Sequence, residues 1–333
     1  MKLTCHNINH GIALIVSRLK YDDDFIYRNS RNGATLSYNE PCMIVFSNPN
    51  RCACSVKSRD ANPFFHLFES LWMLAGRNDV PFLTLFNRNM ANYSDDGTVF
   101  NAAYGYRLRR HFGKDQLAAI VEDLRRDNTS RQAVALIWSP DDLGKDTKDK
   151  ACNLELVFKL TDNILDMTVF NRSNDIVYGT FGANAVHMSM IMMYVCSKLG
   201  CRLGKYYQIS NCLHAYTEGT EGKILQKLMD DDLTKYEYPL SYITTDYFDG
   251  KVDSDISQLF ALYDDTELSP TPVRMLYEEY ESTLFRNLVI PMLELWIKYK
   301  VSGKDAIHLT DYAAIKPLDW RKACEIWIEN RSR

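Results

Sequence analysis

The sequence predicts an α/β (α+β) protein in which helices pack a large mixed or antiparallel sheet, with extra helices in the C-terminal third. Residues 153–160 and 164–171 alternate between apolar and polar side chains, as half-buried strands do, and the Asp-Asn pair between them suits a tight hairpin turn. Residues 64–75 and 184–199 are mostly apolar, have the length of helices and are each followed by a glycine. With 333 residues, 46% of them hydrophobic, the chain can bury a large core.

Composition argues against several classes of protein. A net charge of −4 does not suit a polyanion-binding surface, so we expect no DNA partner, although a small basic pocket for one phosphate is compatible with it. Nine cysteines, an odd number, and no signal peptide predict reduced thiols and a cytoplasmic location. No apolar run reaches the roughly 18 residues of a membrane span. Cys52 and Cys54 lack metal-ligand spacing, so we expect no metal site.

The first 60 residues are expected to form short strands and turns, and one Gly-containing turn carries Arg31. An Asn-Pro pair at 62–63 then gives the N-terminal signal of the helix at 64–75. The nearly continuous apolar surface of this helix is interrupted by Glu69. A buried carboxylate is costly unless it is paired, and its pKa is usually raised. Glu69 therefore lies either on the one wet stripe of the helix or in a functional site.

The middle of the chain continues the alternation of helices and strands. Residues 114–126 form an amphipathic pattern, residues 133–138 a strand pattern, and the segment between them carries Arg131. His187 lies within the apolar helix at 184–199, where we expect it to be structural. His214 precedes a tyrosine by two residues, and a single histidine of this kind is more often a satisfied core or surface residue than a functional one.

The predicted hairpin brings a thiol and a guanidinium together. Cys152 immediately precedes its first strand and Arg172 immediately follows its second, so both side chains should emerge at the same edge. A neighbouring cation favours the thiolate, which is the nucleophilic form of cysteine. Ser173 and Asp175 follow before the apolar helix begins. This pattern predicts a site built around an activated cysteine.

These features resemble the thymidylate synthase superfamily, whose catalytic cysteine precedes a hairpin that ends in Arg-Ser-x-Asp-x-x-x-Gly. Here that motif spans residues 172–179, and the resemblance extends in ordered motifs from about residue 31 to residue 216. The helix around Glu69 is similar to the family's Glu-Leu-Leu-Trp-Phe-Leu-x-Gly, and Tyr104 matches a tyrosine that lies near the cysteine. The resemblance implies a thymidylate synthase-like catalytic body at 1–230, with acidic loops and helices at 231–333 added to the same domain.

The resemblance also implies a substrate, a pyrimidine nucleoside monophosphate, and a co-substrate, 5,10-methylenetetrahydrofolate. Catalytic roles would fall to Cys152, Glu69, Tyr104, Asn184 and Asp175. The residues expected to bind the nucleotide are Arg31, Arg131, Arg172, Ser173, Asn184, His214 and Tyr216. The folate would meet Asp175, Glu69 and Tyr93. In the family the arginine matched by Arg131 crosses a homodimer interface to the partner's phosphate, so we expect a homodimer.

The sequence departs from the family before the long helix, where it is one residue longer. An ungapped alignment would select Ala183 as the residue that reads the pyrimidine, whereas a one-residue insertion selects Asn184. We choose Asn184 because the spacing onward to His214 is then kept. An amide can both donate and accept, which suits the O4/N3–H edge of uracil, and the cytosine-directed members use Asp there. dUMP is therefore favoured over dCMP.

Two further departures concern the product. Met90 and Tyr93 stand where the family tends to carry two tryptophans against the folate, and no counterpart of the closing C-terminal tail is recognisable. Both differences would admit water and weaken hydride delivery. We therefore expect a 5-hydroxymethyl nucleotide, of the kind made by bacteriophages with modified DNA, with thymidylate synthase proper as the alternative.

Two other classes of function remain open. Cys152 and His214 could be a thiol hydrolase pair, but such a site needs a group that orients the histidine and does not explain Arg31, Arg131 and Arg172. The chain could also be a non-catalytic homologue that binds a nucleotide or RNA.

Overall fold

The computed structural model describes residues 1–236, 241–266 and 280–331. Its strands are β1 (Lys2–Cys5), β2 (Phe25–Ser30), β3 (Gly33–Tyr38), β4 (Cys42–Phe46), β5 (Val134–Leu136), β6 (Asn153–Thr161), β7 (Ile164–Asn171), β8 (Asn174–Asp175), β9 (Arg202–Ser210) and β10 (Leu213–Tyr216). Its α-helices are α1 (Ile8–Tyr21), α2 (Pro63–Leu74), α3 (Val80–Phe86), α4 (Tyr104–Tyr106), α5 (Gln116–Arg126), α6 (Asn184–Leu199), α7 (Gly219–Asp230), α8 (Val252–Thr266), α10 (Ile290–Ser302), α11 (Leu309–Ala313) and α12 (Leu318–Glu329).

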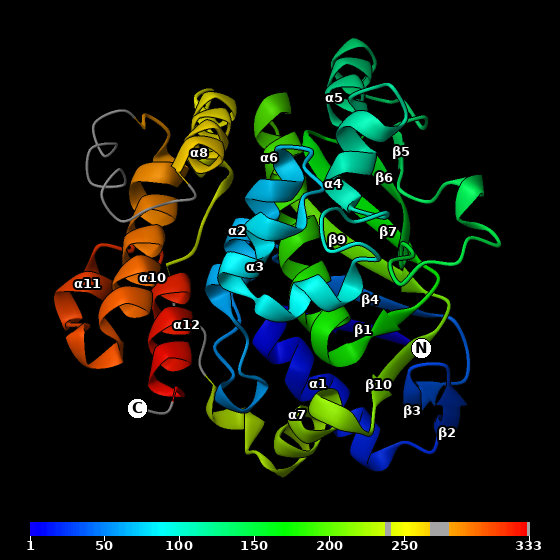
Figure 1. Ribbon diagram of the computed structural model, residues 1–333. Helices are drawn as coiled ribbons and strands as arrows, with labels where there is room; N and C mark the ends of the chain where they lie inside the picture. Colours follow the sequence, from blue (N-terminus) through cyan, green and yellow to red (C-terminus); the bar gives the residue numbers. More distant parts are fainter. Residues whose placement is uncertain (237–240, 267–279, 332–333) are drawn as a thin grey trace.

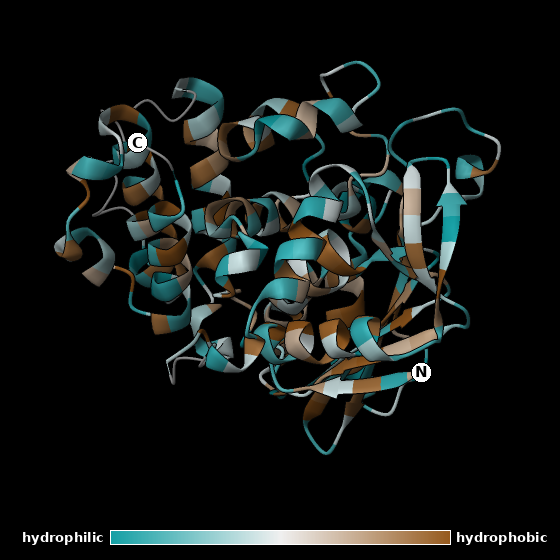
Figure 2. Cartoon of the chain, turned by 90° about the horizontal axis from the view of Figure 1, so that it is seen from below, coloured by the Kyte–Doolittle hydropathy of each residue, from teal (hydrophilic) through white to brown (hydrophobic). Residues whose placement is uncertain are grey.

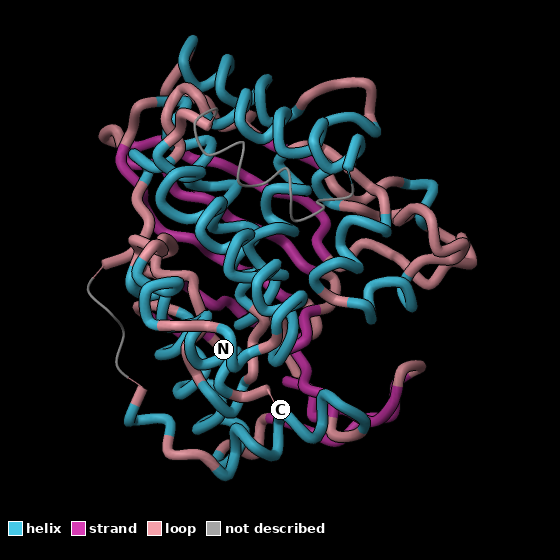
Figure 3. Tube along the Cα trace, turned by 60° about the vertical axis from the view of Figure 1, so that its left-hand side comes forward, coloured by secondary structure: helices cyan, strands magenta, loops and turns pink. Residues whose placement is uncertain are grey.

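The larger sheet has six strands in the order β1-β4-β9-β7-β6-β5. It is mixed, because β7 and β9 run parallel, as do β1 and β4, while β6 pairs antiparallel with both β7 and β5. Helices gather on one side of this layer, and in Figure 3 they lie in front of the magenta strands. The predicted α/β class with a large mixed sheet is confirmed.

The hairpin of β6 and β7 forms where the sequence places it. Asp162 and Asn163 both have positive φ, 50° and 60°, which is the conformation of the tight turns that match the twist of paired strands. The turn sets the register, and alternate residues of both strands are then buried. Members of this buried row are Leu156, Phe158, Leu165, Met167 and Val169.

The helix α6 is the centre of the core. Thirteen of its residues, from Asn184 to Cys196, are buried, because the sheet covers one side and α2 packs on another. Its C-terminus is closed by Gly200, which has a φ of 65° that a glycine adopts without strain. Figure 2 shows hydrophobic segments in brown on the strands and on the helices that face them.

A smaller sheet carries the N-terminal turn toward the hairpin edge. Its order is β2-β3-β10-β8, so that β10 lies between the β2–β3 hairpin and the short strand that follows Arg172. On one side β10 pairs with β3, from His214↔Ser37 to Tyr216↔Thr35, and on the other side its start pairs with β8 through His214↔Asp175. Segments that are far apart in the sequence thus meet at one place.

The prediction of short strands and turns for the first 60 residues is wrong for α1. Asn7 caps this helix through its side chain, which accepts a hydrogen bond of 2.8 Å from the backbone N–H of His10. The buried apolar stripe recurs at helical spacing, with Ile8, Ile12, Ile15, Val16 and Leu19. Its pattern is interrupted by the buried Asn9, which is satisfied by hydrogen bonds to Ser55, a partner that lies far along the sequence.

The C-terminal helices pack on α2 and lie on the left in Figure 1, opposite β6 and β7. Phe64 contacts Trp296 of α10 and Trp327 of α12, with ring centroids 5.1 and 5.6 Å apart. The helical region predicted at 275–299 appears from Phe285 onward, while its beginning lies outside the described residues. Within the described ranges, no helix combines the length and the apolar character needed to cross a membrane.

Candidate active site

Cys152 and Arg172 meet at the open end of the β6–β7 hairpin, as the sequence predicts. The backbone N–H of Arg172 donates to the carbonyl of Cys152 over 3.0 Å, and its guanidinium Nη2 lies 3.7 Å from the Cys152 Sγ. The guanidinium is fixed by two further bonds, from Nε to the carbonyl of Ala151 (2.8 Å) and from Nη2 to the carbonyl of Lys150 (3.1 Å). A thiol and a rigidly held cation are therefore in contact.

The electrostatic balance at Cys152 differs from the prediction. Burial raises the pKa of this thiol, Arg172 lowers it, and the carboxylates of Asp149 and Asp175 raise it again. The net direction is upward because burial outweighs Arg172, although the arginine itself favours the thiolate, as expected. The thiol is half-buried, as a group that a substrate must reach can be.

Tyr104 lies directly against Cys152. Its hydroxyl oxygen accepts a hydrogen bond of 3.3 Å from the backbone N–H of Cys152. Burial raises the pKa of Tyr104, so its O–H keeps its proton and remains available as a donor. Tyr104 begins the short helix α4, which packs on α2.

Glu69 of α2 faces His187 of α6 in the interior. The Glu69 Oε2 and His187 Nε2 atoms are 3.2 Å apart. Burial raises the pKa of Glu69 to about 8 and lowers that of His187 to about 3, so at neutral pH a protonated carboxyl faces a neutral imidazole. The His187 ring also hydrogen-bonds the backbone carbonyl of His66, which fixes its plane. The expectation that His187 is merely structural misses this contact.

The segment before Asn184, where the sequence predicts an inserted residue, forms a π-helical turn. The segment Ile176–Ala183 (η5) has the wider hydrogen-bond ring that accommodates one additional residue, with non-helical backbone at Phe181 and Gly182. This turn leads straight into α6 and leaves Asn184 as its first residue. The Asn184 amide is buried and bonds Asn153 and Asn174 at 3.1 Å each, so it points toward the hairpin edge that carries Cys152.

Asp175 joins the site through the small sheet. Its Oδ2 accepts a hydrogen bond of 2.5 Å from the backbone N–H of Tyr178, which caps η5. Its Oδ1 is buried and has no hydrogen-bond partner among the described residues. Burial raises the pKa of Asp175, while His214, its neighbour across the β8–β10 pairing, lowers it. One acidic oxygen is thus available to a donor.

His214 and Tyr216 follow each other on β10, with their rings perpendicular and their centroids 5.1 Å apart. Tyr216 hydrogen-bonds the side chain of Asn32 in the β2–β3 turn and is influenced by the charges of Cys152 and Asp175. Arg31 is exposed in that same turn. The N-terminal turn and β10 therefore border the region of the thiol.

Three other predicted residues differ in their placement. Tyr93 is 51% exposed, and its electrostatic neighbours include Asp175 and Tyr216, which puts it at the mouth of the site. Ser173 is half-buried beside Arg172. Arg131 is exposed in the segment between α5 and β5 and has no part in these contacts.

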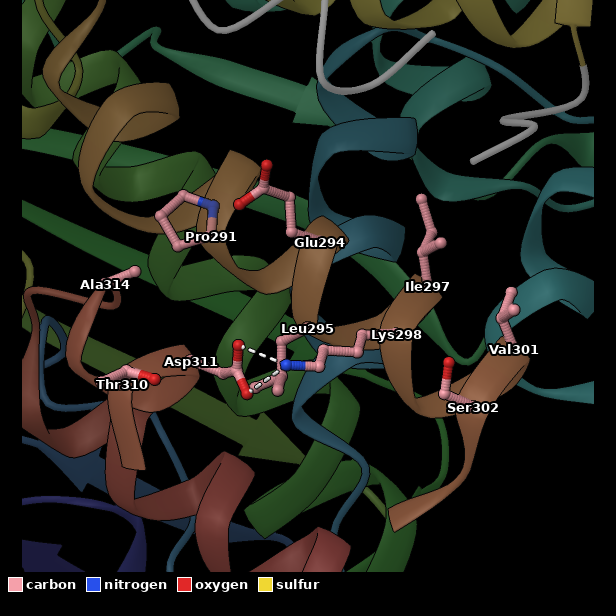
Figure 4. A pocket seen from close by; sticks show the side chains of 10 residues that line it. All are labelled: Pro291, Glu294, Leu295, Ile297, Lys298, Val301, Ser302, Thr310, Asp311 and Ala314. Carbon is pink, nitrogen blue, oxygen red and sulfur yellow. Dashed lines mark hydrogen bonds and ion pairs between the residues drawn. The ribbon is translucent and has the colours of Figure 1, made fainter. Parts of the chain in front are cut away.

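A concave region elsewhere is separate from this cluster. A cavity of about 520 Å³ lies beside α10 and α11, and Lys298 and Asp311 in its lining form an ion pair of 2.7 Å. Figure 4 shows the side chains that line it. None of its lining residues is among those predicted for the site. It lies with the C-terminal helices, across the molecule from β6 and β7 (Figure 1).

Several polar residues of the site region were not predicted from the sequence. They are His187, Asn153, Asn171, Asn174 and Gln208. The sequence pattern could have indicated them, because they are polar residues at inward positions of otherwise apolar elements. Polar side chains at such positions must be hydrogen-bonded when they are buried.

Comparison with known proteins agrees with this geometry. Residues 31–260 match the family model described as thymidylate synthase. A deoxyuridylate hydroxymethyltransferase of Pseudomonas phage M6 is 36% identical over 98% of this chain and 93% of its own length. Proteins of the same name from Bacillus phage SP01 and Delftia phage PhiW-14 are 44% and 26% identical, over 62% and 57% of this chain and 58% and 56% of their own lengths.

Proposed function

The chain belongs to the thymidylate synthase family, and from this premise we propose that it converts dUMP into the 5-hydroxymethyl nucleotide. The similarity to the M6 phage enzyme over 98% of the chain supports this product, since that relative is a deoxyuridylate hydroxymethyltransferase. The observation that carries the chemistry is the cluster of Cys152, Arg172 and Tyr104 at the hairpin edge. A half-buried thiol held against a cation and a phenol suits covalent catalysis.

Catalysis begins with bond formation between the Cys152 sulfur and C6 of the uracil. Pyrimidine C5 is a poor nucleophile until this bond forms, after which negative charge collects on O4. Asn184 and the protonated carboxyl of Glu69 are the donors that would stabilise that charge, Glu69 through a bound water. Because burial raises the pKa of Glu69 to about 8, the carboxyl can donate at neutral pH.

The nucleotide would be held by its phosphate and its sugar. Arg31, Arg172 and Ser173 would bind the phosphate through charge-assisted hydrogen bonds. His214 and Tyr216 on β10 would hold the sugar 3′-hydroxyl. The β2–β3 turn and β10 both border the thiol, so a nucleotide that contacts both would present its base to Cys152.

The site also fits a folate co-substrate, which we propose to be 5,10-methylenetetrahydrofolate. The buried Oδ1 of Asp175 has no partner among the described residues, and such an acceptor suits the N–H groups of a pterin. Glu69 and the exposed Tyr93 would complete the contacts. When bound, the folate supplies the one-carbon unit that C5 receives.

Water then decides the product. Loss of the C5 proton to a base of the site and departure of tetrahydrofolate would leave an exocyclic methylene at C5. This methylene is conjugated with C4=O, so a water oxygen can add to it while the electron pair moves onto O4. The proton lost by this water passes to a base of the site, and return of the electron pair expels the Cys152 thiolate from C6. One molecule of water is added, the free enzyme is restored, and no reductant is consumed.

We propose that the protein acts as a homodimer in which Arg131 of each subunit reaches the phosphate of the other. The face of the large sheet turned away from α6 carries half-buried side chains on three adjacent strands, including Val157, Phe170, Tyr207 and Ile209. A second copy would cover this apolar face. Arg131 is exposed and free of contacts with its own site, as a residue that serves a neighbour would be.

Product analysis tests the proposal. The protein is incubated with dUMP or dCMP and methylenetetrahydrofolate, and the nucleotide is identified by mass spectrometry. We expect 5-hydroxymethyl-dUMP, formed faster than any dCMP product, and no turnover by Cys152→Ala. Thymidylate with dihydrofolate would show a thymidylate synthase proper, and unchanged nucleotide binding with no turnover in either protein would show a non-catalytic homologue.

A further inference from the structure

Five buried side chains around Asn184 form a closed ring of hydrogen bonds. Ser210 Oγ donates to Asn171 Oδ1 (3.4 Å), and the Asn171 amide donates to Asn153 Oδ1. Asn153 Nδ2 donates to Asn184 Oδ1 (3.1 Å), and Asn184 Nδ2 donates to Asn174 Oδ1 (3.1 Å). Asn174 Nδ2 closes the ring by donating to Ser210 Oγ (3.2 Å). Every member donates to the next in the same rotational sense.

The large sheet builds this ring. Asn153 of β6 pairs with Asn171 of β7, which pairs with Ser210 of β9, so three members form one row across adjacent strands. Asn174 comes from β8 and Asn184 from the first turn of α6. All five side chains are buried, with at most 8% of each residue exposed, so water cannot replace a missing partner.

A ring of this kind has two possible directions. A side-chain amide that is rotated by half a turn exchanges its donor and its acceptor, and a hydroxyl can rotate to suit either neighbour. If every member reversed, each hydrogen bond would still be made. The ring alone therefore cannot hold Asn184 in one orientation.

Gln208 removes this ambiguity. Its Nε2 donates to the backbone carbonyl of Thr180 over 3.2 Å, and its Oε1 accepts from Asn174 Nδ2 over 2.8 Å. A backbone carbonyl can only accept, so Gln208 must turn its NH₂ group toward Thr180 and its oxygen toward Asn174. Asn174 must then present its own NH₂ group, and this choice fixes the direction of the whole ring.

The direction matters because of what the pyrimidine presents. The ring uses one lone pair and one N–H of the Asn184 amide, so one lone pair and one N–H remain for the base. Uracil offers a donor at N3 and an acceptor at O4, whereas cytosine offers an acceptor at N3 and a donor at N4. An Asn184 amide that is free to rotate by half a turn can match either base, and one that is locked can match only one.

We propose that Gln208, anchored on the Thr180 carbonyl, is a positioning residue that locks the Asn184 amide and so makes the site discriminate between uracil and cytosine. The inference rests on the proposed function, namely on a pyrimidine nucleotide as substrate and on Asn184 as the residue that meets its base. It assigns specificity to a fully buried side chain that lies outside the set of residues expected to contact the base.

Two variants, Gln208→Leu and Gln208→Met, test this role. Each removes the anchor and leaves the ring free to run in both directions. The dissociation constants of dUMP and dCMP are measured by titration calorimetry, and kcat/KM is measured for both nucleotides. We expect dUMP binding to weaken by no more than about twofold, because about half of the molecules keep the original direction. We expect dCMP binding to improve by about tenfold, since the reversed ring no longer breaks a buried hydrogen bond.

Three matched variants separate this role from a general loss of packing. Asn9→Leu removes another buried amide, which is bonded to Ser55 and has no link to the ring, and should leave the dUMP/dCMP ratio unchanged. Ser210→Ala opens the ring but leaves Gln208 in place, so the ratio should stay within about threefold of wild type. Gln208→Glu, which as a neutral acid can donate to Thr180 and accept from Asn174, should also keep the ratio.

The outcomes are distinct. If folded Gln208→Leu and Gln208→Met weaken both nucleotides equally, or keep the wild-type ratio, Gln208 has a structural role only and the inference is overturned. If wild type binds nucleotides but makes no product, the proposed reaction fails, while the ratio of the two dissociation constants still decides the role of Gln208.

Discussion

Burial determines the protonation of Glu69, and its stability effect can be measured. The pKa of this carboxyl rises from 4.5 to about 8 on folding, so the folded protein binds the extra proton between those pH values and the unfolded chain does not. Stability should therefore fall as pH rises through this window. Through this group, the free energy of unfolding of the wild type should fall by roughly 3 kcal/mol between about pH 5 and pH 8. We expect this part of the fall to be absent in Glu69→Gln, as measured by urea unfolding. Glu122→Gln, on an exposed position of α5, is the control and should keep the wild-type slope. A wild-type slope in Glu69→Gln as well would contradict the assignment.

The contact between Arg172 and Cys152 leads to a second prediction about a single side chain. Arg172 lowers a thiol pKa that burial raises, so its loss should raise that pKa further and leave less thiolate at neutral pH. We expect Arg172→Gln to slow alkylation of Cys152 by iodoacetamide by about tenfold or more, as followed by peptide mass spectrometry. Arg126→Gln, whose side chain is exposed on α5, should react at the wild-type rate. An equal rate in Arg172→Gln and wild type would show that the cation does not act on the thiol.

The site residues that could be placed from the sequence are those whose neighbours in space are also close along the chain. Cys152 and Arg172 could be paired because a two-residue turn joins their strands and fixes the register. His187 and Gln208 could not be assigned, because their partners Glu69 and Thr180 come from other elements and only tertiary packing brings them together. The net direction of the Cys152 pKa could not be predicted from the sequence for a similar reason. Burial is a property of the whole fold, and here it outweighs the adjacent charge.

Among the elements, η5 is the segment in which the sequence predicts one inserted residue. A π-helical turn can take up an additional residue, and α6 begins directly after this turn at Asn184. Gly182 makes this turn possible, because a Cβ there would lie 2.7 Å from Arg59 Nη2 and 3.0 Å from the Val177 carbonyl oxygen. The sequence predicted the insertion from spacing, but spacing does not determine the backbone conformation.

We expect Gly182→Ala to lower the free energy of unfolding by about 1–3 kcal/mol, through steric contact with Arg59 and the Val177 carbonyl. The same change at Gly250, where an added Cβ meets nothing within 4 Å, should cost less than about 0.5 kcal/mol. Urea unfolding of both variants measures the difference. Equal stabilities would mean that η5 does not depend on a glycine.

The helix α1 could not be predicted from its sequence pattern. Its apolar stripe is interrupted by Asn9, His10 and Gly11, which look like turn residues in isolation. Gly11 is needed because the ring of Phe181 in η5 packs against it, and Asn9 is satisfied by Ser55. Both reasons are tertiary, so the sequence alone favoured a turn.

At the scale of the whole molecule, the proposed homodimer can be tested by subunit complementation. Arg131→Ala and Cys152→Ala proteins should each be nearly inactive. After the two are mixed and allowed to exchange subunits, a heterodimer contains one site with both residues intact. A twofold assembly predicts recovery of about a quarter of wild-type activity, because about half of the dimers are mixed and half of their sites are complete. No recovery under conditions where exchange is verified would place Arg131 in the site of its own chain, or outside any site.

The most direct test of the account is the origin of the oxygen in the product. Wild-type protein is incubated with dUMP and methylenetetrahydrofolate in water enriched in the heavy oxygen isotope, and the nucleotide product is analysed by mass spectrometry. We expect a 5-hydroxymethyl nucleotide that carries one heavy oxygen in its hydroxymethyl group, with no dihydrofolate formed. A product that contains a methyl group in place of the hydroxymethyl group, accompanied by dihydrofolate, would contradict it.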